Sequence, residues 1–470
     1  MAEDGTETIT VISPHTEEPI ATVTAPGPAD VDTAVVTARA AFDHGPWPRL
    51  DAGERIAVVR RLAEIYAARG GEMAELISRE IGAPISFSRR VQVGMPNALM
   101  GAFATLAEGY VWQEDRAGFF GAPVRVRREP VGVVAAITPW NVPQLLIVAK
   151  LIPALLTGCT IIVKPAPESP LDALLLAEML AQVDLPPGVV QVLPGRTEVG
   201  ARLVSHPGID KVSFTGSTAA GRAVAAAAAE NLTRVSLELG GKSAAVVLDD
   251  ADPQAVATGV RLASLANSGQ VCNALSRILV PAARAGEYVD ALAAELAGLR
   301  VGDPADPDTV IGPLISSRQQ ERVRDYIRSG QADGARLVLG GTELPDGLDS
   351  GWYVRPTLFA DADNSMTIAR EEIFGPVLTV IGYRDEEEAI EIANDSDYGL
   401  AGSVFTADTD RGLAVAAAVR TGTFGVNAGY PMDPVAPFGG VKCSGYGREL
   451  GTEGLDGYVE TKSIALPRQR

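Results

Sequence analysis

The stretch KVSFTGSTAAGRAVAAAAAENLTRVSLELG, from Lys211 to Gly240, decides the fold class. It opens with a short β-rich run (211–216), continues as a helical pattern of small residues (217–230) and ends in a second apolar run (234–240). A strand, a crossover helix and a further strand form the unit from which parallel sheets are built. The stretch therefore predicts an α/β fold.

Further segments on both sides of this stretch repeat the alternation. Near-continuous apolar strands separated by helices are typical of parallel sheets that are buried on both faces. Before the stretch we expect strands at VGVVAAI (131–137), CTIIVKP (159–165) and GVVQVLP (188–194), with a helix at 170–183. After it we expect strands at 243–250, 276–281, 377–383, 402–406 and 422–427, and helices at about 254–267, 283–299, 316–329 and 386–394. The pattern predicts two doubly wound units.

Composition and charge exclude several classes of protein. The 470 residues carry a net charge of −19, which argues against binding to phosphate backbones or anionic membranes. The start MAEDGTETIT lacks the features of a signal peptide, and no apolar run reaches the roughly 18 residues of a membrane span. The three cysteines, Cys159, Cys272 and Cys443, are too sparse for a disulfide framework. We expect a cytoplasmic protein that binds neither nucleic acid nor membranes.

One segment departs from the buried-strand pattern. APVRVRREP (122–130) alternates apolar and basic residues, as a half-exposed strand does. The C-terminal stretch GYVETKSIALP (457–467) has a similar character. Either could extend a sheet edge or pair with another subunit.

The stretch GQVCNALSR (269–277) sets Cys272 among small and amide-bearing residues. On base rates, a free cysteine is a small apolar side chain in a core, so this stretch alone does not establish a nucleophile. The three histidines, His15, His44 and His206, lie far from it in the sequence, and none forms a pair at metal-ligand spacing. If Cys272 is a nucleophile, a carboxylate is the expected base, and we expect no metal site.

Two further motifs end predicted strands with polar side chains. Asn141 in TPWN (138–141) follows a strand, where its amide can stabilise an oxyanion or simply cap the next helix. Glu238 in LELGGKS (237–243) lies at the end of an apolar strand, where burial raises the pKa of a carboxyl group. That suits a general base, although a structural carboxylate satisfied by backbone N–H groups is the alternative.

Three motifs suggest a ligand with phosphate and ribose groups. The turn at Gly216 and Ser217 leads from a strand into a helix, whose N-terminus favours phosphate. Lys164 could meet a ribose hydroxyl or a phosphate, Glu372 could hold a ribose, and Phe374 could press on a flat ring. Taken singly, each also fits an ordinary turn, surface lysine or loop.

Together these motifs resemble the aldehyde dehydrogenase superfamily, from about residue 8 to residue 465. TPWN, FTGST, LELGGKS, GQVCNALSR, EEIFGPV and FGGVKCSGYGRELG occur in the order of that family. The resemblance implies a Rossmann-like NAD(P)-binding domain (1–111 and 131–240), a catalytic domain (241–445) and a small β oligomerisation arm (112–130 and 457–470). It places the chain in the hydrolytic branch that does not acylate CoA.

The resemblance also assigns roles to residues of the site. Cys272 is implied as the nucleophile, and Asn141 together with the Cys272 backbone N–H as the oxyanion donors. A thioester intermediate follows, and Glu238 activates the water that hydrolyses it. A free thiol has a pKa of about 8.5, so thiolate formation needs help. Lys150 and Glu449 match family positions proposed for a proton relay.

The resemblance also implies which residues bind the cofactor and which form contacts between subunits. The positions expected near NAD or NADP are Ile137, Thr138, Pro139, Trp140, Lys164, Gly195, Phe214, Gly216, Ser217, Leu239, Glu372 and Phe374. Arg234, Arg448 and Glu460 resemble a charge cluster that supports a subunit interface. A homotetramer or homodimer is implied.

One position departs from the family pattern. Many NAD-preferring members carry Glu three residues after the lysine, whereas this chain has Pro167 there and Glu168 one step further. Without a carboxylate at that point a 2′-phosphate meets less repulsion. We therefore expect NAD to be used and NADP to be tolerated.

The substrate is expected to be an apolar aldehyde. The predicted entrance is mostly apolar and includes Met95, Met100, Phe103, Leu145, Val271, Asn273, Tyr430 and Met432. This favours aliphatic, terpenoid or aromatic aldehydes over charged semialdehydes. Three alternatives remain: a CoA-acylating dehydrogenase, a cysteine hydrolase without cofactor, and a non-enzymatic binding protein on a retained fold.

Overall fold

The computed structural model describes residues 7–467, and its first large sheet has six strands. Five of them run parallel, and β19 pairs antiparallel with the edge strand β9. Their order is β19 (Gly445–Tyr446), β9 (Arg234–Glu238), β8 (Lys211–Thr215), β5 (Val133–Ile137), β6 (Thr160–Lys164) and β7 (Val190–Val192). The strands predicted between residues 131 and 240 are confirmed.

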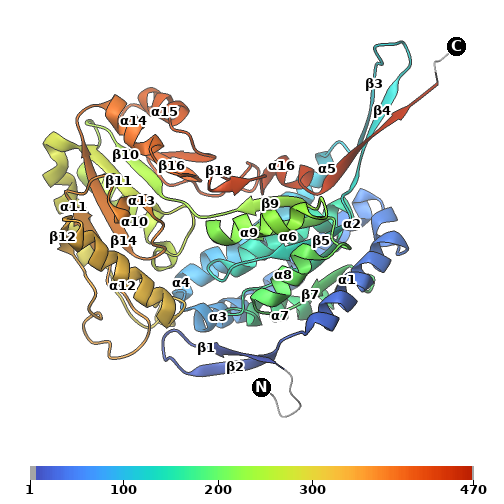
Figure 1. Cartoon of the computed structure of the whole chain (residues 1–470), viewed down its shortest axis with the longest axis horizontal. Coiled ribbons are helices and arrows are strands. Elements are labelled where there is room, and N and C mark those ends of the chain that lie inside the picture. Colours follow the sequence, from blue (N-terminus) through green and yellow to red (C-terminus); the bar gives the residue numbers. More distant parts are fainter. Residues whose placement is uncertain (1–6, 468–470) are drawn as a thin grey trace.

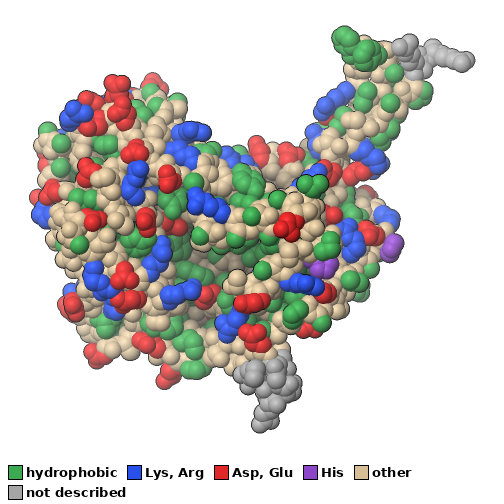
Figure 2. Space-filling model, viewed as in Figure 1, with side chains coloured by type: hydrophobic (Ala, Val, Ile, Leu, Met, Phe, Trp, Pro, Cys, Tyr) green, Lys and Arg blue, Asp and Glu red, His purple; other side chains and the backbone are tan. Residues whose placement is uncertain are grey.

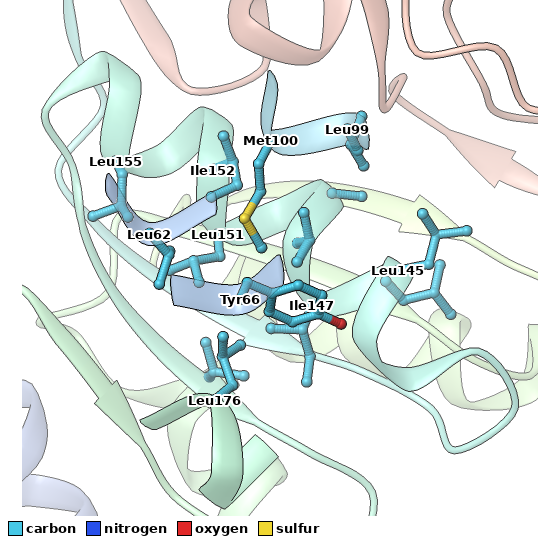
Figure 3. Close-up of a cluster of buried hydrophobic side chains, with 14 of the residues drawn as sticks. Leu62, Tyr66, Leu99, Met100, Leu145, Ile147, Leu151, Ile152, Leu155 and Leu176 are labelled. Atoms are coloured by element: carbon cyan, nitrogen blue, oxygen red, sulfur yellow. The ribbon is translucent and has the colours of Figure 1, made fainter. Parts of the chain in front are cut away.

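Helices cover both faces of this sheet (Figure 1). The largest core cluster joins one face to α2 (Ala52–Ala68), α3 (Gly70–Ile81), α5 (Met95–Gly109), α6 (Pro143–Thr157) and α7 (Leu171–Leu180). Figure 3 shows side chains of α2, α5, α6 and α7 meeting in this cluster. The opposite face packs against α1 (Pro28–Asp43), α8 (Thr197–Ser205) and α9 (Thr218–Ala229).

Helix α6 is buried along its whole length because its sequence, PQLLIVAKLIPALLT, is almost entirely apolar. Pro143 stands in its first turn, where a missing N–H costs nothing. The helix ends at Gly158, which has a left-handed conformation with φ of 91°. Lys150 is the one charged residue of this buried helix, and its charge must therefore be satisfied inside the protein.

The second large sheet has seven strands, and only β12 runs antiparallel. Its order is β12 (Arg336–Leu339), β13 (Thr357–Ala360), β14 (Val377–Tyr383), β11 (Leu275–Pro281), β10 (Ser243–Val247), β16 (Ala401–Phe405) and β17 (Thr423–Val426). One face packs against α10 (Pro253–Ser264) and α11 (Ala285–Ala297). The other packs against α12 (Ser317–Ala332), α13 (Thr367–Arg370), α14 (Glu386–Asn394) and α15 (Thr409–Ala418). The two doubly wound units are confirmed.

A three-stranded antiparallel arm projects from the body of the molecule (Figure 1). It consists of β20 (Val459–Ala465), β4 (Val124–Pro130) and β3 (Gln113–Arg116) in that order. The two segments predicted as half-exposed strands thus pair with each other, although they are more than 300 residues apart in the sequence. The structure does not describe residues 468–470 of the predicted arm or residues 1–6 of the predicted cofactor domain.

Several elements were not predicted from the sequence. They include a hairpin of β1 (Thr8–Ile12) and β2 (Pro19–Thr24), the short pair β15 (Tyr398–Gly399) and β18 (Val441–Lys442), and helices α4 (Ile85–Phe87) and α16 (Gly451–Asp456). Short 3-10 helices occur at 47–49, 266–269 and 282–284, and a π-helical segment at 88–94. Within residues 7–467, no helix has both the length and the apolar character that crossing a membrane requires.

Candidate active site

A cavity of about 540 Å³ lies between the two sheets, at the carboxyl ends of β5, β8 and β9. Figure 2 shows the surface hollowed between the two lobes. Ligands of open α/β sheets bind at such strand ends. Three predicted catalytic residues line it, namely Asn141, Glu238 and Cys272. Seven predicted cofactor residues line it as well: Pro139, Trp140, Gly216, Ser217, Leu239, Glu372 and Phe374.

Cys272 is held in the wall by an unusual backbone turn. Asn267, Ser268 and Gly269 are consecutive left-handed residues, with φ of 48°, 58° and 76°. A Cβ on Gly269 would lie 2.3 Å from the backbone oxygen of Gly375, so only glycine fits there. The Ser268 hydroxyl donates to the backbone oxygen of Gly312 at 2.8 Å, which fixes the turn to a neighbouring loop. This geometry presents the Cys272 thiol to the cavity.

Asn141 is fixed by three hydrogen bonds around the same turn. Its backbone oxygen accepts from Gln92 Nε2 and from Asn267 Nδ2, both at 2.9 Å. Its side-chain Nδ2 donates to the backbone oxygen of Gln270 at 2.9 Å. The amide donor is therefore held against the backbone of Gln270, two residues before Cys272 in the sequence, and is preorganised as an oxyanion donor must be.

Glu238 ends strand β9 as a buried carboxyl group. Within the described residues neither of its side-chain oxygens has a hydrogen-bond partner. Burial raises its pKa well above the usual range, and the negative charge of Glu449 raises it further, while Lys150 and Arg448 act in the opposite direction. Gly439, with φ of 154°, lets the chain approach so closely that a Cβ there would lie 2.6 Å from Glu238 Oε1. A carboxyl group in this setting can take a proton near neutral pH.

The Cys272 thiol is strongly disfavoured as a thiolate in this state. Burial raises its pKa to about 12, and the carboxylates of Glu372 and Glu238 contribute to the increase. Backbone N–H groups of Cys272 and Asn273 act in the opposite direction. Forming the thiolate therefore requires a group that accepts the proton or a positive charge that enters the cavity.

Lys150 and Glu449 form a buried ion pair behind the cavity wall. Lys150 Nζ donates to the Glu449 carboxylate and, at 2.6 Å, to Thr215 Oγ1. Both charged side chains are almost completely buried. Thr215 lines the cavity, so this pair contacts the cavity wall without lining it.

The cavity walls fit a nicotinamide dinucleotide. Glu372 accepts a hydrogen bond from the Gly241 backbone N–H at 3.0 Å, and burial raises its pKa to about 7. The rings of Trp140 and Phe374 lie 5.5 Å apart in an edge-to-face arrangement. Ser217 Oγ caps α9 by accepting from Ala220 N. A ribose acceptor, flat apolar walls and a helix N-terminus are the groups that such a ligand needs.

Five predicted cofactor residues are not among those that line this cavity. Thr138 N donates to the backbone oxygen of Lys164 at 3.1 Å, which joins the ends of β5 and β6. Burial lowers the pKa of Lys164 to about 8. The other three are apolar or small: Ile137 and Phe214 belong to the core under α8 and α9, and Gly195 packs against Val199.

Most residues of the predicted substrate entrance are half-buried. Val271, Cys272, Tyr430 and Met432 pack as half-buried residues against the largest core cluster, together with Met95. Leu145 is buried in that cluster, and Asn273 is half-buried. Met100 and Phe103 have no exposed surface, so their predicted place on an open wall is wrong and they belong to the core beneath it.

Only two of the three residues predicted to form a charge cluster interact with each other. Arg234 on β9 pairs with Glu460 on β20. Arg448 instead donates to the backbone oxygens of Gly440 and Gly447, at 2.9 and 2.6 Å. The ion pair ties the first large sheet directly to the arm.

Sequence reasoning missed groups that only the fold brings together. Arg318, Gln319 and Arg322 of α12 line the cavity. Gln319 Nε2 also donates to the backbone oxygen of Phe374 at 2.8 Å and so supports the aromatic wall. The sequence of α12 is typical of a polar amphipathic helix, so no local signal distinguishes these three residues from residues on a solvent-exposed face.

Taken together, the fold and cavity are those of an α/β oxidoreductase, with a thiol, an amide and a carboxyl group lining a cleft that suits a dinucleotide. The chain belongs to the aldehyde dehydrogenase family, whose profile matches residues 1–464. It is an NAD(P)-dependent enzyme that oxidises an aldehyde to a carboxylic acid.

Individual relatives agree with this assignment. The chain is 46% identical over 466 residues to geranial dehydrogenase of Castellaniella defragrans, covering 99% of this chain and 97% of the relative. A crystal structure of a Mycobacterium tuberculosis aldehyde dehydrogenase complexed with NAD+ matches with a TM-score of 0.97 and 48% identity, over 99% of this chain and 95% of the other. Aldehyde dehydrogenase C of Pseudomonas syringae, complexed with NAD+ and octanal, matches with a TM-score of 0.94 and 43% identity, over 97% and 93% of the two chains.

Proposed function

We propose that Cys272, Asn141 and Glu238 carry out the oxidation of an apolar aldehyde. The observation that supports this most directly is that all three line one cavity together with Glu372 and Phe374. A nucleophile, an oxyanion donor, a base and a dinucleotide cleft are the parts that the reaction needs. No other described cavity combines them.

The first covalent step forms a bond from Cys272 Sγ to the aldehyde carbon. The carbonyl oxygen becomes an oxyanion, which Asn141 Nδ2 and the Cys272 backbone N–H stabilise. When bound, NAD+ would accept the hydride that leaves this carbon. The carbon is then held as a thioester on Cys272, beside Trp140, Glu372 and Phe374, which would hold the dinucleotide.

The second step hydrolyses the thioester. Glu238 takes a proton from a water molecule, and the hydroxide adds to the thioester carbon. The C–S bond breaks, the carboxylic acid leaves and Cys272 regains its sulfur electron pair. The raised pKa of Glu238 suits it to hold this proton briefly before passing it on.

Lys150 and Glu449 support both steps from behind the wall. Their ion pair contacts Thr215, which lines the cavity, and Glu449 acts electrostatically on Glu238. We infer that the pair accepts protons released by Cys272 and Glu238. Removal of either charge would leave the other buried and unpaired, at a cost of several kcal/mol in stability.

The substrate is proposed to be an aliphatic, terpenoid or aromatic aldehyde. The support is the apolar character of Val271, Tyr430, Met432 and the core beneath them. One relative is named geranial dehydrogenase, and another was crystallised with octanal. Both geranial and octanal are apolar aldehydes.

The experiment that tests this function follows NADH absorbance with purified enzyme and an aldehyde panel. Geranial, octanal and benzaldehyde should give kcat/KM values at least tenfold above those of succinic semialdehyde. A preference for the charged semialdehyde would contradict the proposed substrate class. Stoichiometric acyl-CoA without free acid, on addition of CoA, would instead identify an acylating dehydrogenase.

NAD is proposed as the preferred cofactor with NADP tolerated. Pro167 provides no carboxylate, and Glu168 Oε1 lies 4.0 Å from Arg318 Nη2, so its charge is partly balanced. A 2′-phosphate therefore meets little net repulsion at this edge of the cleft.

A homotetramer or homodimer in the cytoplasm is proposed as the working form. The arm is a three-stranded sheet whose tip carries Phe119 with 95% of its surface exposed. An exposed aromatic next to open strand edges suits a subunit contact. The three thiols of the chain are free, as expected in a reducing compartment.

A further inference from the structure

Two carboxyl groups lie inside the largest hydrophobic core, away from the active-site cavity. Glu80 on α3 and Asp172 in the first turn of α7 have no exposed surface. Within residues 7–467 neither of them forms an ion pair with a lysine, arginine or histidine. Two buried negative charges without a cation would be very costly, so the protonation state of this pair needs an explanation.

Glu80 uses both of its carboxyl oxygens to cap α7. Its Oε1 accepts from Leu171 N at 2.7 Å, and its Oε2 accepts from Asp172 N at 3.2 Å. The free N–H groups and the positive end of the dipole at a helix N-terminus favour a negative charge. Of the two carboxyl groups, Glu80 is therefore the one suited to be ionised.

Asp172 contacts an amide side chain instead. Gln144 Nε2, in the first turn of α6, donates to Asp172 Oδ2 at 2.6 Å and to the Asp172 backbone oxygen at 3.1 Å. In the part of the chain that the structure describes, two buried oxygens of this contact have no hydrogen-bond partner, namely Asp172 Oδ1 and Gln144 Oε1. Both are acceptors when Asp172 is ionised. A proton on Asp172 Oδ1 makes that oxygen a donor, so that the carboxyl and amide groups can form two hydrogen bonds.

Repulsion between like charges favours the same proton. The Asp172 backbone N–H contacts the Glu80 carboxyl group, so the two acids share one buried site, where both do not ionise near neutral pH. Burial raises the pKa of Asp172 to about 7. It also raises the pKa of Glu80, and the charge of Asp172 adds to that increase.

The other helices that pack around Asp172 supply no compensating charge. From α2, the buried Tyr66 hydroxyl has no hydrogen-bond partner among the described residues, and burial and Asp172 both raise its pKa. Figure 3 shows Tyr66 in the core cluster that α2, α6 and α7 share. From α3, the exposed Arg79 lowers the pKa of Glu80 without forming an ion pair. From α6, Asp172 meets only the uncharged Gln144.

The contact between Gln144 and Asp172 fixes the part of α6 that adjoins the cavity. The helix begins at Pro143, two residues after Asn141, and Leu146 of its first turn lines the cavity. Gln144 lies between these two cavity residues in the sequence. A shift of this turn would therefore displace the segment that carries the amide of Asn141.

We propose that Asp172 holds a proton and is a positioning residue for Asn141, because its protonated carboxyl group binds the Gln144 amide and fixes the first turn of α6. Above neutral pH the Asp172 O–H bond breaks, the proton passes to solvent, and the hydrogen bond to Gln144 Oε1 is lost. The core then contains two negative charges, so the contact between α6 and α7 weakens. The effect on Asn141 rests on the proposed function, whereas the proton on Asp172 does not.

Infrared difference spectroscopy of the wild type against Asp172→Asn tests for the proton. An asparagine amide can donate to Gln144 Oε1 and accept from Gln144 Nε2, so this variant mimics the protonated acid at every pH. The difference spectrum should contain the carbonyl band of one protonated carboxyl group at pH 5, and the band should disappear as the pH rises through about 7. Asp184→Asn is the matched control, since it removes an exposed carboxyl group just after α7, and it should show no such band.

Thermal unfolding and hydrogen exchange test the hold on α6. Because the folded-state pKa of Asp172 is raised, its contribution to stability is fully present below the unfolded pKa of about 3.9 and is lost as the pH rises through about 7. Between pH 5 and pH 8 the Tm of the wild type should therefore fall more than the Tm of Asp172→Asn. Backbone amides of residues 144–148 in the wild type should exchange faster at pH 8 than at pH 6, after correction for the intrinsic rate. This last measurement needs no variant and holds even if Asp172→Asn fails to fold.

Turnover tests the effect on Asn141. The ratio of kcat in Asp172→Asn to kcat in the wild type should be close to one at pH 6. Above pH 8 it should rise to about threefold, a small part of the roughly hundredfold loss that a misplacement of about 1 Å can cause. Taking the ratio removes the titration of the other active-site groups, which the two proteins share.

The possible outcomes separate the parts of the proposal. A difference spectrum without the band at pH 5, or with a band that stays unchanged up to pH 9, overturns the proton on Asp172. A band that titrates as expected, together with parallel Tm profiles, constant exchange in α6 and a constant kcat ratio, overturns the positioning role. A wild-type enzyme that oxidises no aldehyde contradicts the proposed function, and the infrared and exchange measurements then still decide whether Asp172 holds a proton and fixes α6.

Discussion

Asn141 Nδ2 lies 2.9 Å from the backbone oxygen of Gln270, two residues before Cys272. The amide that should stabilise the oxyanion is thus already held by the nucleophile's own loop. Asn141→Ala should lower kcat by about a hundred- to a thousandfold, the usual loss of one oxyanion donor. The dissociation constant of NAD+, measured by fluorescence titration, should stay within threefold of wild type. A weakened NAD+ affinity with unchanged kcat would contradict the role of Asn141.

The Cys272 thiol should be unreactive at neutral pH in the absence of ligands. Because its pKa is raised to about 12, the thiolate fraction and the rate of alkylation by iodoacetamide should rise about tenfold per pH unit from pH 7 to 10. Mass spectrometry of the modified peptide measures this rate. Saturation of the rate below pH 9 would contradict the raised pKa.

Replacement of the same thiol gives a sharper test of its chemistry. Cys272→Ala should abolish dehydrogenase turnover and also the burst of p-nitrophenolate that the wild-type enzyme releases from p-nitrophenyl acetate. It should retain NAD+ binding. Cys443→Ala is the matched control, since this half-buried thiol contacts Arg222 and lies outside the cavity lining. It should keep wild-type activity, and residual bursts in Cys272→Ala would point to another nucleophile.

Glu238→Gln should separate the two chemical steps. The burst of NADH should remain, because the base acts after hydride transfer, and steady-state turnover should fall by at least a hundredfold. Stopped-flow absorbance measures both phases. Loss of the burst together with turnover would place Glu238 in thiol activation instead.

The same variant should change the pH dependence of stability. The folded-state pKa of Glu238 is raised, so its contribution to stability is present below the unfolded pKa of about 4.3 and is lost as pH rises toward the folded value. Glu238→Gln should therefore have the wild-type Tm near pH 4 and a higher Tm at pH 8. Scanning calorimetry at both pH values checks the sign.

Cofactor preference should be moderate. The kcat/KM ratio of NAD to NADP should stay below about a thousandfold, which corresponds to about 4 kcal/mol. Pro167→Glu should increase that ratio by placing a carboxylate where a 2′-phosphate would lie. A wild-type ratio above a thousandfold would contradict the expected tolerance.

Local sequence signals predicted most of the parallel strands and the residues at their ends. Strands such as 133–137 and 377–383 are almost entirely buried, and Glu238 and Asn141 stood out as candidates because each lies at or just after the end of a predicted strand. The hairpin of β1 and β2 was missed because β1 is only five residues long and β2 is largely exposed with no regular burial pattern. The roles given to Met100 and Phe103 failed because apolar character does not tell an entrance wall from the core behind it.

The buried polar residues of β8 show a different limit of sequence patterns. Lys211, Ser213 and Thr215 alternate with Val212 and Phe214, a pattern that is typical of a strand with one solvated face. The structure buries that face against Lys150, which donates to Thr215, and against Tyr458, whose ring centre lies 5.0 Å from Lys211 Nζ; both come from remote parts of the chain. Long-range partners of this kind leave no trace in the local sequence.

The pairing of β19 with β9 has a consequence for synthesis of the protein on the ribosome. Until residues 445–446 have emerged, the strand that ends in Glu238 is an uncovered sheet edge. Glu449 and Tyr458, which satisfy the buried charges beside it, emerge later still. A nascent chain of about 440 residues can therefore have both sheets formed and still expose the unpaired, aggregation-prone edge of β9 and an incomplete interior. Ribosomal stalling or truncation near this point would produce an inactive, aggregation-prone species and a strong need for chaperones.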